Sequence, residues 1–342
     1  MRILITGASG FIGSHLVSQA LSRGYEVWAG MRATSSHRYL PSQSVHFITL
    51  HLDSVATLSE ELAAFKSQNG GGWDYIIHAA GATKGRNEQE FMETNYEGTC
   101  HLVEALRQQE MLPKRLLYMS SLSVLGAIKE HPAHPADGHV YAPMTDGDVA
   151  RPNTAYGRSK LASEKYLLQQ SDLNVVIMRP TGVYGPRERD YYLMAKSLKQ
   201  HLDFSVGYKP QEITFIYVLD LVEACFIALE RGTNGSRYLV SDGNTYHSDD
   251  FSRLLKEQMG IRHVLPVKAP LWLLYIVCAV SGLVAKVTGR MTALNRDKYN
   301  ILKQRNWRCD ISPLLKLGYQ PAWDLERGVK ATVDWYKQAQ WI

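Results

Sequence analysis

One short segment constrains the fold of this chain more than any other. Residues 6–13 read TGASGFIG, and they lie between an apolar run at 2–6 and a helical pattern at 12–23 that ends at Gly24. A strand, a glycine-rich turn and a helix in this order leave backbone N–H groups free at the positive end of the helix dipole, which favours an anion. The segment therefore predicts a βα unit that binds the diphosphate of a dinucleotide. A glycine turn that only reverses the chain is the alternative.

The three glycines of this loop have different tasks. Gly7 permits the tight turn, Gly10 lets the backbone approach a pyrophosphate, and Gly13 lets the helix pack closely on the sheet. The loop positions that we also expect beside the cofactor are Ser9, Phe11 and Ile12.

The remainder of the first half alternates short apolar runs with helical patterns. We predict strands at 2–6, 25–31, 45–50, 73–78, 115–120 and 174–179, and helices at 12–23, 55–68, 88–109 and 154–170. This alternation is typical of an α/β fold with a doubly wound parallel sheet. After Pro180 it breaks, and only residues 213–230 return to a strand and a helix. We therefore predict a Rossmann domain over 1–180 plus 213–230, and a smaller, mixed C-terminal substrate-binding lobe from 184–212 and 237–342.

Composition excludes collagen-like, disordered and disulfide-scaffold proteins. A chain of 342 residues with 45% hydrophobic and 21% charged residues is long enough to bury a large core and is typical of globular proteins. The net charge of +5 is a mild excess that we interpret as spread along the chain, so we expect no nucleic-acid partner. The four cysteines, Cys100, Cys225, Cys278 and Cys309, form no CxxC pair, and no secretion signal is evident. We expect reduced thiols and a cytoplasmic protein, with association to a membrane as an option.

Four further motifs follow the glycine loop in order. They are HAAG at 78–81, YGRSK at 156–160, RPTGVYGP at 179–186 and LGYQP at 317–321. With the TGxxGxxG spacing, they resemble the extended short-chain dehydrogenase/reductase family, also called the NAD-dependent epimerase/dehydratase superfamily, over nearly the whole chain. The resemblance implies a nicotinamide dinucleotide cofactor. It places along that cofactor Ala79, Ala80 and Gly81, and near its nicotinamide Pro180 and Val183.

Tyr156 and Lys160 are the candidates for proton transfer. They are four residues apart on a predicted helix, so they share one face. A free tyrosine titrates near about 10, and a neighbouring ammonium favours the phenolate and lowers that value. Such a pair can exchange a proton with an alcohol or ketone near neutral pH. The resemblance implies that Lys160 also binds the nicotinamide ribose. An ordinary exposed helix pair is the alternative, because this spacing arises often by chance.

A hydroxyl group should polarise the reacting oxygen. Residues 117–123, LYMSSLS, lie at the carboxyl end of a predicted strand, where α/β sheets place ligands. The family's serine or threonine lies five positions before a glycine, and Gly126 selects Ser121. Ser123 is the second choice, and Ser120 is expected to face the cofactor. Asn95 resembles a family asparagine beside the nicotinamide ribose, with a bond to helix backbone as the alternative.

The residues after the second predicted strand indicate which nicotinamide cofactor is used. NAD enzymes usually carry an acid there that holds the ribose 2′-hydroxyl, but no acid lies between Glu26 and Asp53. Arg32 and Arg38 occupy this region, and an arginine suits a 2′-phosphate. We predict NADP(H), with NAD as the alternative. Leu52 and Asp53 are weaker candidates for the adenine, because register puts His51 where the family has an aspartate.

Residues 269–285 carry no charge and are flanked by Lys268 and Lys286. A membrane-spanning helix needs about 20 apolar residues, so we interpret this run as a buried helix or the wall of an apolar substrate pocket. Contact with a membrane surface is a further interpretation. The segment resembles the 3β-hydroxysteroid and sterol dehydrogenase branch of the family.

The resemblance implies an NAD(P)-dependent oxidoreductase that transfers a hydride to or from a secondary alcohol or ketone, with an apolar ring substrate such as a steroid. The alternative is a nucleotide-sugar epimerase, dehydratase or reductase, whose diphosphate Arg187, Arg189 or Lys196 could hold. A non-catalytic NADP-binding sensor would be marked by loss of the Tyr/Lys pair, which is present here. A homodimer is a further expectation. We expect no metal, since the histidines in the loop 127–152 lack ligand spacing, namely His131, His134 and His139.

Overall fold

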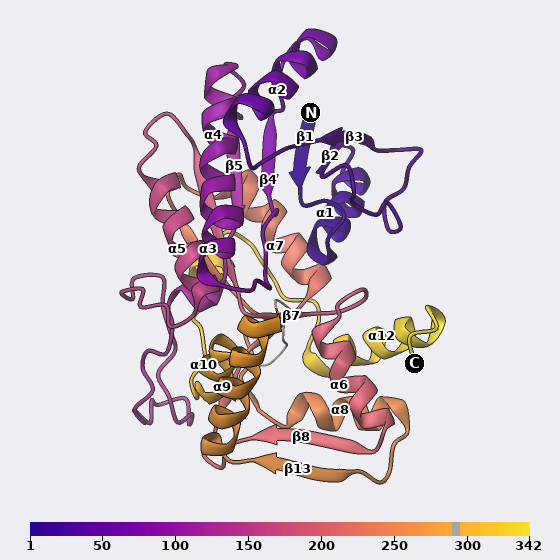
Figure 1. Cartoon of the computed structure of the whole chain (residues 1–342), viewed down its shortest axis with the longest axis vertical. Helices are drawn as coiled ribbons and strands as arrows, with labels where there is room; N and C mark the ends of the chain where they lie inside the picture. Colours follow the sequence, from indigo (N-terminus) through magenta and orange to yellow (C-terminus); the bar gives the residue numbers. More distant parts are fainter. Residues whose placement is uncertain (289–294) are drawn as a thin grey trace.

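The computed structural model describes residues 1–288 and 295–342, with side chains of the helix that begins at Leu271 described as far as Gly282. At its centre lies a seven-stranded parallel sheet in the order β11-β6-β5-β4-β1-β2-β3 (Figure 1). The strands are β1 (Arg2–Thr6), β2 (Glu26–Met31), β3 (His46–Thr49), β4 (Tyr75–His78), β5 (Arg115–Met119), β6 (Val175–Pro180) and β11 (Arg237–Val240).

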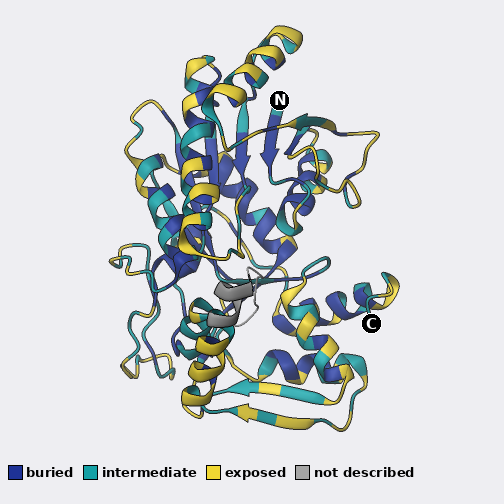
Figure 2. Cartoon of the chain, viewed as in Figure 1, coloured by how far each residue is buried: buried dark blue, intermediate teal, exposed yellow. Residues whose placement is uncertain are grey.

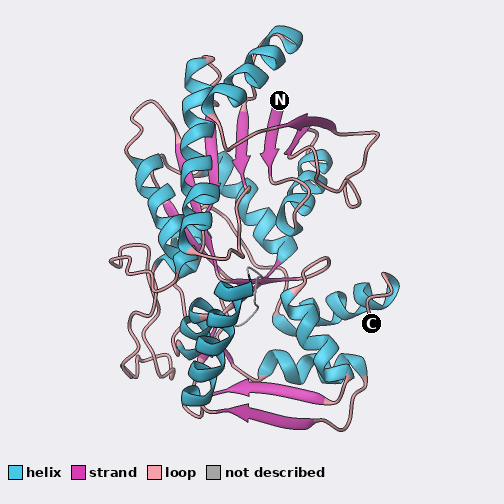
Figure 3. Ribbon diagram, in the orientation of Figure 1, coloured by secondary structure: helices cyan, strands magenta, loops and turns pink. Residues whose placement is uncertain are grey.

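Helices flank this sheet on both faces (Figure 3). Successive residues of a strand point to opposite faces, so Ile3 and Ile5 pack on one side and Leu4 on the other. The first side is covered by α1 (Phe11–Ser22) and α7 (Val218–Arg231), and the second by α2 (Val55–Asn69), α4 (Gly98–Gln108) and α5 (Ala155–Leu168). Burial on both faces explains the continuous apolar runs of the strands. The predicted doubly wound α/β fold is confirmed.

The strand order reverses between β1 and β4. From β1 the chain continues to β2 and β3 on one side, and from β4 to β5 and β6 on the other. The segments after β1 and β4 therefore diverge at the carboxyl edge of the sheet, which is where open α/β sheets bind ligands. The glycine loop and the HAAG motif both lie at this position.

Two C-terminal segments complete the Rossmann domain, contrary to the predicted division. β11 is an edge strand of the main sheet, paired with β6. The segment around α11 (Ser312–Leu315) packs on the same core through Ile311, Leu314 and Tyr319. The assignment of all of 237–342 to the lobe is therefore wrong for these segments. β11 has only four residues and is followed by a turn, not a helix, so the alternating pattern does not extend to it.

The lobe lies beyond the carboxyl edge of the sheet and has its own aromatic core, which includes Tyr184, Phe215, Phe251 and Tyr336. Its helices are α6 (Asp190–Lys199), α8 (Asp250–Met259), α9 (Leu271–Thr288), α10 (Arg296–Lys303) and α12 (Leu325–Gln338). Its paired strands are β7 (Gly182–Tyr184) with β10 (Phe215–Tyr217), β9 (Glu212–Ile213) with β12 (Tyr246–His247), and β8 (Leu202–Val206) with β13 (Leu265–Ala269). Within the described residues, no helix is long and apolar enough to cross a membrane.

A buried ion pair joins β6 to α5. Arg179 and Glu164 are 2% and 1% exposed, and the Arg179 Nη2 atom lies 2.5 Å from Glu164 Oε2. Ser120, just after β5, donates its hydroxyl proton to the same carboxylate. Ser120 was expected to face the cofactor, and this expectation is wrong because its side chain points into the interior. The three side chains thus link the end of β5 to α5 and β6.

Loss of one partner should therefore destabilise the protein strongly. We expect Arg179→Met to lower the free energy of unfolding by about 3–5 kcal/mol, because it leaves a buried carboxylate without its counter-charge. Urea denaturation followed by circular dichroism measures this. Lys330→Met, which removes an exposed ion pair with Asp334, is the control and should change stability by less than about 1 kcal/mol. Equal effects of the two substitutions would contradict the structural role of the pair.

Candidate active site

The glycine loop packs closely on its own chain and leaves the start of α1 without a side-chain cap. Gly7 has a φ of +68°, and a Cβ there would lie 2.8 Å from the carbonyl oxygen of Ala79. At Gly13 a Cβ would lie 2.1 Å from the carbonyl oxygen of Gly7. No side chain caps the start of α1, and its first turn carries no acid. Its free N–H groups thus fit an anion such as a dinucleotide diphosphate.

Residues 79–82 pass between the glycine loop and α5. On one side Ala79 and Ala80 contact Gly7; on the other, a Cβ at Gly81 would lie 2.8 Å from Asn95 Oδ1 and 3.1 Å from Lys160 Nζ. Only a residue without a side chain fits at position 81. The structure thus brings the predicted Ala79, Ala80 and Gly81 between the loop and the lysine.

A buried chain of hydrogen bonds fixes this segment. The Ala80 N–H donates to Thr6 Oγ1, which lies 2.7 Å from His78 Nδ1, and His78 Nε2 lies 3.0 Å from Thr99 Oγ1. Thr99 donates its own proton to the Asn95 carbonyl, so His78 must donate through Nε2 and accept through Nδ1. Burial, with Lys160 adding to it, lowers the pKa of His78 to about 3, and the ring stays neutral.

Asn95 lies in a π-helical turn, η1 (Met92–Glu97), between α3 (Glu88–Phe91) and α4. We predicted one helix over 88–109, and the structure inserts this wider turn, a feature found often at functional sites. The Asn95 amide accepts the Ala82 N–H at 2.7 Å and donates to the Ala82 carbonyl and to Ser159 Oγ. Both amide protons are thereby used within the protein, so Asn95 holds residues 79–82 against α5.

Tyr156 and Lys160 lie on the first turns of α5, whose start is capped by Thr154. Lys160 is buried and donates to the Met119 carbonyl at 2.8 Å. Burial lowers the pKa of Lys160 to about 8, and the Glu164 carboxylate opposes this shift. Burial raises the pKa of Tyr156 to about 12, and the Ser121 hydroxyl opposes that rise. The expected lowering of the tyrosine pKa is therefore absent in the free protein, where burial outweighs the hydrogen bond with Ser121.

Of the three candidate serines, Ser121 is the one beside the Tyr156 phenol. Its Oγ accepts the hydroxyl proton of Ser123 at 2.9 Å and the Ser123 N–H at 3.2 Å. Ser123 is buried, and its hydroxyl is used in that bond. The geometry thus favours Ser121 over Ser123 as the group that would meet a substrate oxygen.

The arginines that could bind a phosphate lie in different surroundings. Arg32 follows β2 directly, and both Arg32 and Arg38 are exposed. Arg187 does not point into the lobe: its Nη1 donates to Ser14 Oγ on α1 at 2.8 Å, and its guanidinium stacks on Tyr39, as Arg38 does from 5.3 Å. Under the nucleotide-sugar alternative, Arg187 was one of three cations that could hold a substrate diphosphate; its guanidinium lies instead beside α1.

The remaining predicted cofactor positions lie around the same edge. Ser9, Phe11 and Ile12 are half-buried at the start of α1, while Pro180 ends β6 and Val183 lies in β7. Leu52 is half-buried and lies near Gly98, and Asp53 is exposed before α2. His51 forms a hydrogen bond with Glu61, and the role of Asp53 stays a prediction.

Comparison with known protein families identifies the family of this chain. The model of the NAD dependent epimerase/dehydratase family matches residues 3–241. The chain belongs to this family. It is thus an NAD(P)-dependent enzyme of the extended short-chain dehydrogenase/reductase type, as the motifs predicted.

Relatives in this family act on different substrates. The chain is 26% identical to 4-hydroxy-2-methyl-3-oxo-4-farnesyl-3,4-dihydroquinoline-1-oxide ketoreductase of Stigmatella aurantiaca, over 77% of this chain and 74% of that protein. It is 29% identical to a 3-beta-hydroxysteroid dehydrogenase of Mycolicibacterium neoaurum, over 74% of this chain and 68% of that protein. Its fold is similar to that of the dTDP-glucose 4,6-dehydratase of Streptomyces venezuelae, solved with NAD and TYD bound, with a TM-score of 0.77, 22% identity and coverage of 99% and 98%.

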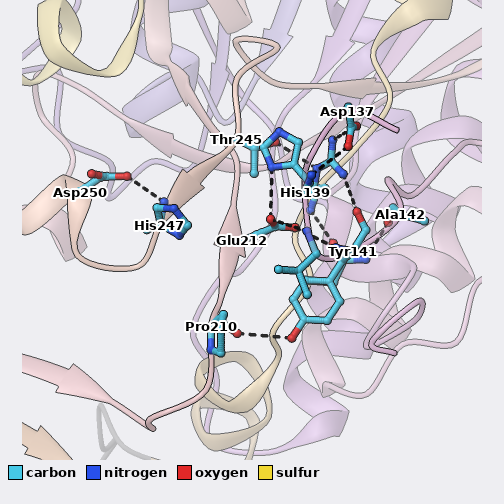
Figure 4. A network of polar contacts seen from close by, with 12 residues as sticks. Asp137, His139, Tyr141, Ala142, Pro210, Glu212, Thr245, His247 and Asp250 are labelled. Atoms are coloured by element: carbon cyan, nitrogen blue, oxygen red, sulfur yellow. Dashed lines mark hydrogen bonds and ion pairs between the residues drawn. The ribbon is translucent and has the colours of Figure 1, made fainter. Parts of the chain in front are cut away.

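The loop 127–152 forms no metal site within the described residues. His139 lies 3.2 Å from the buried Glu212, whose carboxylate also accepts the N–H groups of Val140 and Tyr141 (Figure 4). Asp137 pairs with Arg308 at 2.6 Å. The carboxylate of Glu212 is thus satisfied by protein groups, and this network fixes the loop to the lobe.

Sequence reasoning missed three residues that pack around the candidate site, namely Thr6, Thr99 and Glu164. Each acts through another group and not on a ligand. His78 stands in the HAAG motif, but its partners lie 72 and 21 residues away in the chain. For Glu164 a signal existed, since it follows Lys160 by four residues on the same helix face.

The pKa of Lys160 leads to a prediction about cofactor affinity. A lysine pKa near 8 means that the ammonium is present below this pH and is lost above it. We therefore expect the affinity for the nicotinamide cofactor to fall as the pH rises through about 8, because a positive charge and a proton donor disappear. Fluorescence titration between about pH 6 and pH 10 measures this. Lys160→Met should bind weakly and without this dependence; a pH-independent wild type would contradict the prediction.

Proposed function

We propose that this protein is an NADP(H)-dependent oxidoreductase that interconverts a secondary alcohol and a ketone on an apolar ring substrate. The observation that carries the proposal is the group formed by Ser121, Tyr156 and Lys160 at the carboxyl edge of the sheet, beside the glycine loop. Lys160 lies beside residues 79–82, which also contact the glycine loop. A sensor without catalysis would not need a phenol beside a hydroxyl and a buried ammonium.

The protein residues divide the chemistry as follows. The bound nicotinamide supplies or accepts the hydride. Tyr156 transfers the proton to or from the substrate oxygen, and Ser121 donates a hydrogen bond to that oxygen. Lys160 binds the nicotinamide ribose and holds a positive charge near the phenol. The raised pKa of Tyr156 keeps its phenol protonated in the free protein, and the protonated phenol is the form that ketone reduction requires.

Asn95 and His78 act in this proposal as positioning residues. They hold residues 79–82 between the glycine loop and Lys160, and neither side chain has a free proton to offer a ligand. Asn95 had two interpretations, a place beside the nicotinamide ribose and a bond to backbone; the bonds of its amide to Ala82 and Ser159 support a positioning role.

The placement of the arginines supports an apolar substrate over a nucleotide sugar. A nucleotide sugar needs a convergent group of cations for its diphosphate. Arg187 is directed onto α1, and Arg189 and Lys196 are exposed. The steroid and farnesylated-quinoline enzymes among the relatives support the same class of substrate, whereas a GDP-6-deoxy-D-mannose reductase of Pseudomonas aeruginosa, 26% identical, supports a nucleotide sugar. A nucleotide sugar is the second candidate.

Activity assays test the reaction. Purified protein with NADPH is offered a panel of ketosteroids, other cyclic ketones and UDP- or dTDP-sugars, and turnover is followed by loss of NADPH absorbance. We expect an apolar ketone to be reduced. Tyr156→Phe should lower kcat by about a hundred- to ten-thousandfold, while cofactor affinity and melting temperature stay near those of the wild type. Stabilisation by nucleotide sugars alone would favour the second candidate, and near-normal turnover by Tyr156→Phe would remove the phenol from the mechanism.

We further propose that the cofactor is NADP(H). Arg32 replaces the acid that would hold a ribose 2′-hydroxyl, and Arg38 and Arg187 add positive charge around Tyr39 near α1. These cations favour a 2′-phosphate, which NAD lacks.

Calorimetric titration with NADPH and NADH tests this preference. We expect tighter binding of NADPH, and Arg32→Ala should reduce its affinity about tenfold or more while leaving that for NADH nearly unchanged, because a charge-assisted bond to a phosphate contributes about 1.5–3 kcal/mol. Arg262→Ala, an exposed arginine on the lobe, is the matched control. Equal affinities of the wild type for both cofactors would reject the proposal.

A further inference from the structure

Helix α9 has an exposed surface of unusual composition. Six large apolar side chains are between 40% and 66% exposed, namely Trp272, Leu273, Tyr275, Ile276, Val277 and Val280. The described part of α9 is drawn largely as exposed in Figure 2, at the end of the lobe near β13. The sequence interpretation of this run as a buried helix or pocket wall is wrong for these residues. Apolar groups gathered in this way usually mark an interaction surface.

The exposed residues share one side of the helix. At 3.6 residues per turn, these six and Ala279 cover an arc of about 200° without one charged group. The opposite side carries Leu274 and Cys278, which are buried, and α9 packs there against α10. A surface helix normally shows its polar face to water. In α9 the most exposed arc is apolar, so its contact with water is energetically unfavourable.

The segment of the chain that contains this apolar face is rich in positive charge. Between Arg262 and Arg308 the chain has nine basic residues and one acidic residue, whereas the whole chain carries a formal charge of +5. The positive excess is thus concentrated here and not spread along the chain, as its modest total had suggested. The single acid, Asp297, accepts the N–H of Ala155. Lys268 lies at the start of α9, exposed, with its ammonium over the Tyr208 ring, and Lys303 on α10 lies over Tyr299.

We propose that the α9 face docks onto the surface of an anionic lipid bilayer. An apolar arc with tryptophan and tyrosine, in a segment with nine basic residues and one acid, has the composition of a helix that lies in the membrane interface. Its apolar side chains enter the acyl boundary, and the lysines meet the lipid phosphates. The surface is independent of the hydride chemistry proposed above.

A second copy of this chain is a poorer occupant of the face. In a two-fold dimer the same surface meets itself, so the basic residues of the two copies would face each other. Like charges at such a border oppose association. An anionic bilayer supplies both the apolar phase and the opposite charge.

The helix that carries this face is linked through α10 to the start of α5. α10 packs on α9, and Asp297 of α10 binds the backbone N–H of Ala155, the residue before Tyr156. Tyr275 of α9 and Tyr299 of α10 have ring centroids 5.3 Å apart. A chain of contacts through α10 thus connects the proposed docking helix to the helix that carries Tyr156.

Vesicle flotation tests the proposal. We expect wild-type protein to float with vesicles of phosphatidylcholine and phosphatidylserine at low salt, and far less with phosphatidylcholine alone. The triple variant Trp272→Ser, Ile276→Ser, Val280→Ser should reduce the bound fraction about tenfold or more, because three apolar side chains no longer enter the lipid. Val149→Ser and Leu168→Ser, which alter exposed apolar residues elsewhere, are the matched controls and should leave binding unchanged.

A second measurement does not depend on the triple variant. Vesicles with brominated acyl chains should quench part of the tryptophan fluorescence of the wild type, and Trp272→Phe should lose that part while binding nearly as well. Absence of wild-type binding to anionic vesicles, or equal binding by the triple variant, would overturn the proposal. So would a wild-type dimer, measured by light scattering, that the triple variant converts to a monomer, since a second copy would then cover the face.

Discussion

The candidate active site depends on the close passage of residues 79–82 between the glycine loop and α5. Two glycines allow it: Gly7, where a Cβ would meet Ala79 and Ala80, and Gly81, where it would meet Asn95 and Lys160. A chain of buried hydrogen bonds from Thr6 through His78 to Thr99 then fixes the segment in one arrangement. The cradle for the cofactor diphosphate and the group that would handle the proton are thereby parts of one packed unit.

Burial has opposite consequences for the two titrating groups of this unit. It lowers the pKa of Lys160 to about 8 and raises that of Tyr156 to about 12, since it disfavours the charged form of each. Glu164 restrains the shift of the lysine, and Glu164 is in turn neutralised by Arg179. The buried ion pair thus has a role in charge balance as well as in stability. It explains why an arginine precedes Pro180 in a strand that is otherwise apolar.

The lobe combines two surfaces of different character. Its aromatic core packs α6, α8 and α12 tightly, but no residue of α10 and no described side chain of α9 belongs to the hydrophobic clusters. Two polar contacts join α10 to the start of α5, namely Asp297 with Ala155 and Asn300 with Asn153. An apolar face at this position fits an enzyme whose proposed substrate prefers lipid to water.

The sequence by itself determined the α/β class, the glycine loop, the Tyr156/Lys160 pair and the family, because each depends on residues close together in the chain. The period of apolar residues and the spacing of a motif are local properties. Only the tertiary structure decided that β11 joins the main sheet, that Ser120 points at Glu164, and that His78 lies between Thr6 and Thr99, because these partners are 21 to 72 residues apart. It also decided the environment of residues 269–285: an uncharged run has the same composition inside a core or on a surface, and only the position of its neighbours determines which face of α9 meets water.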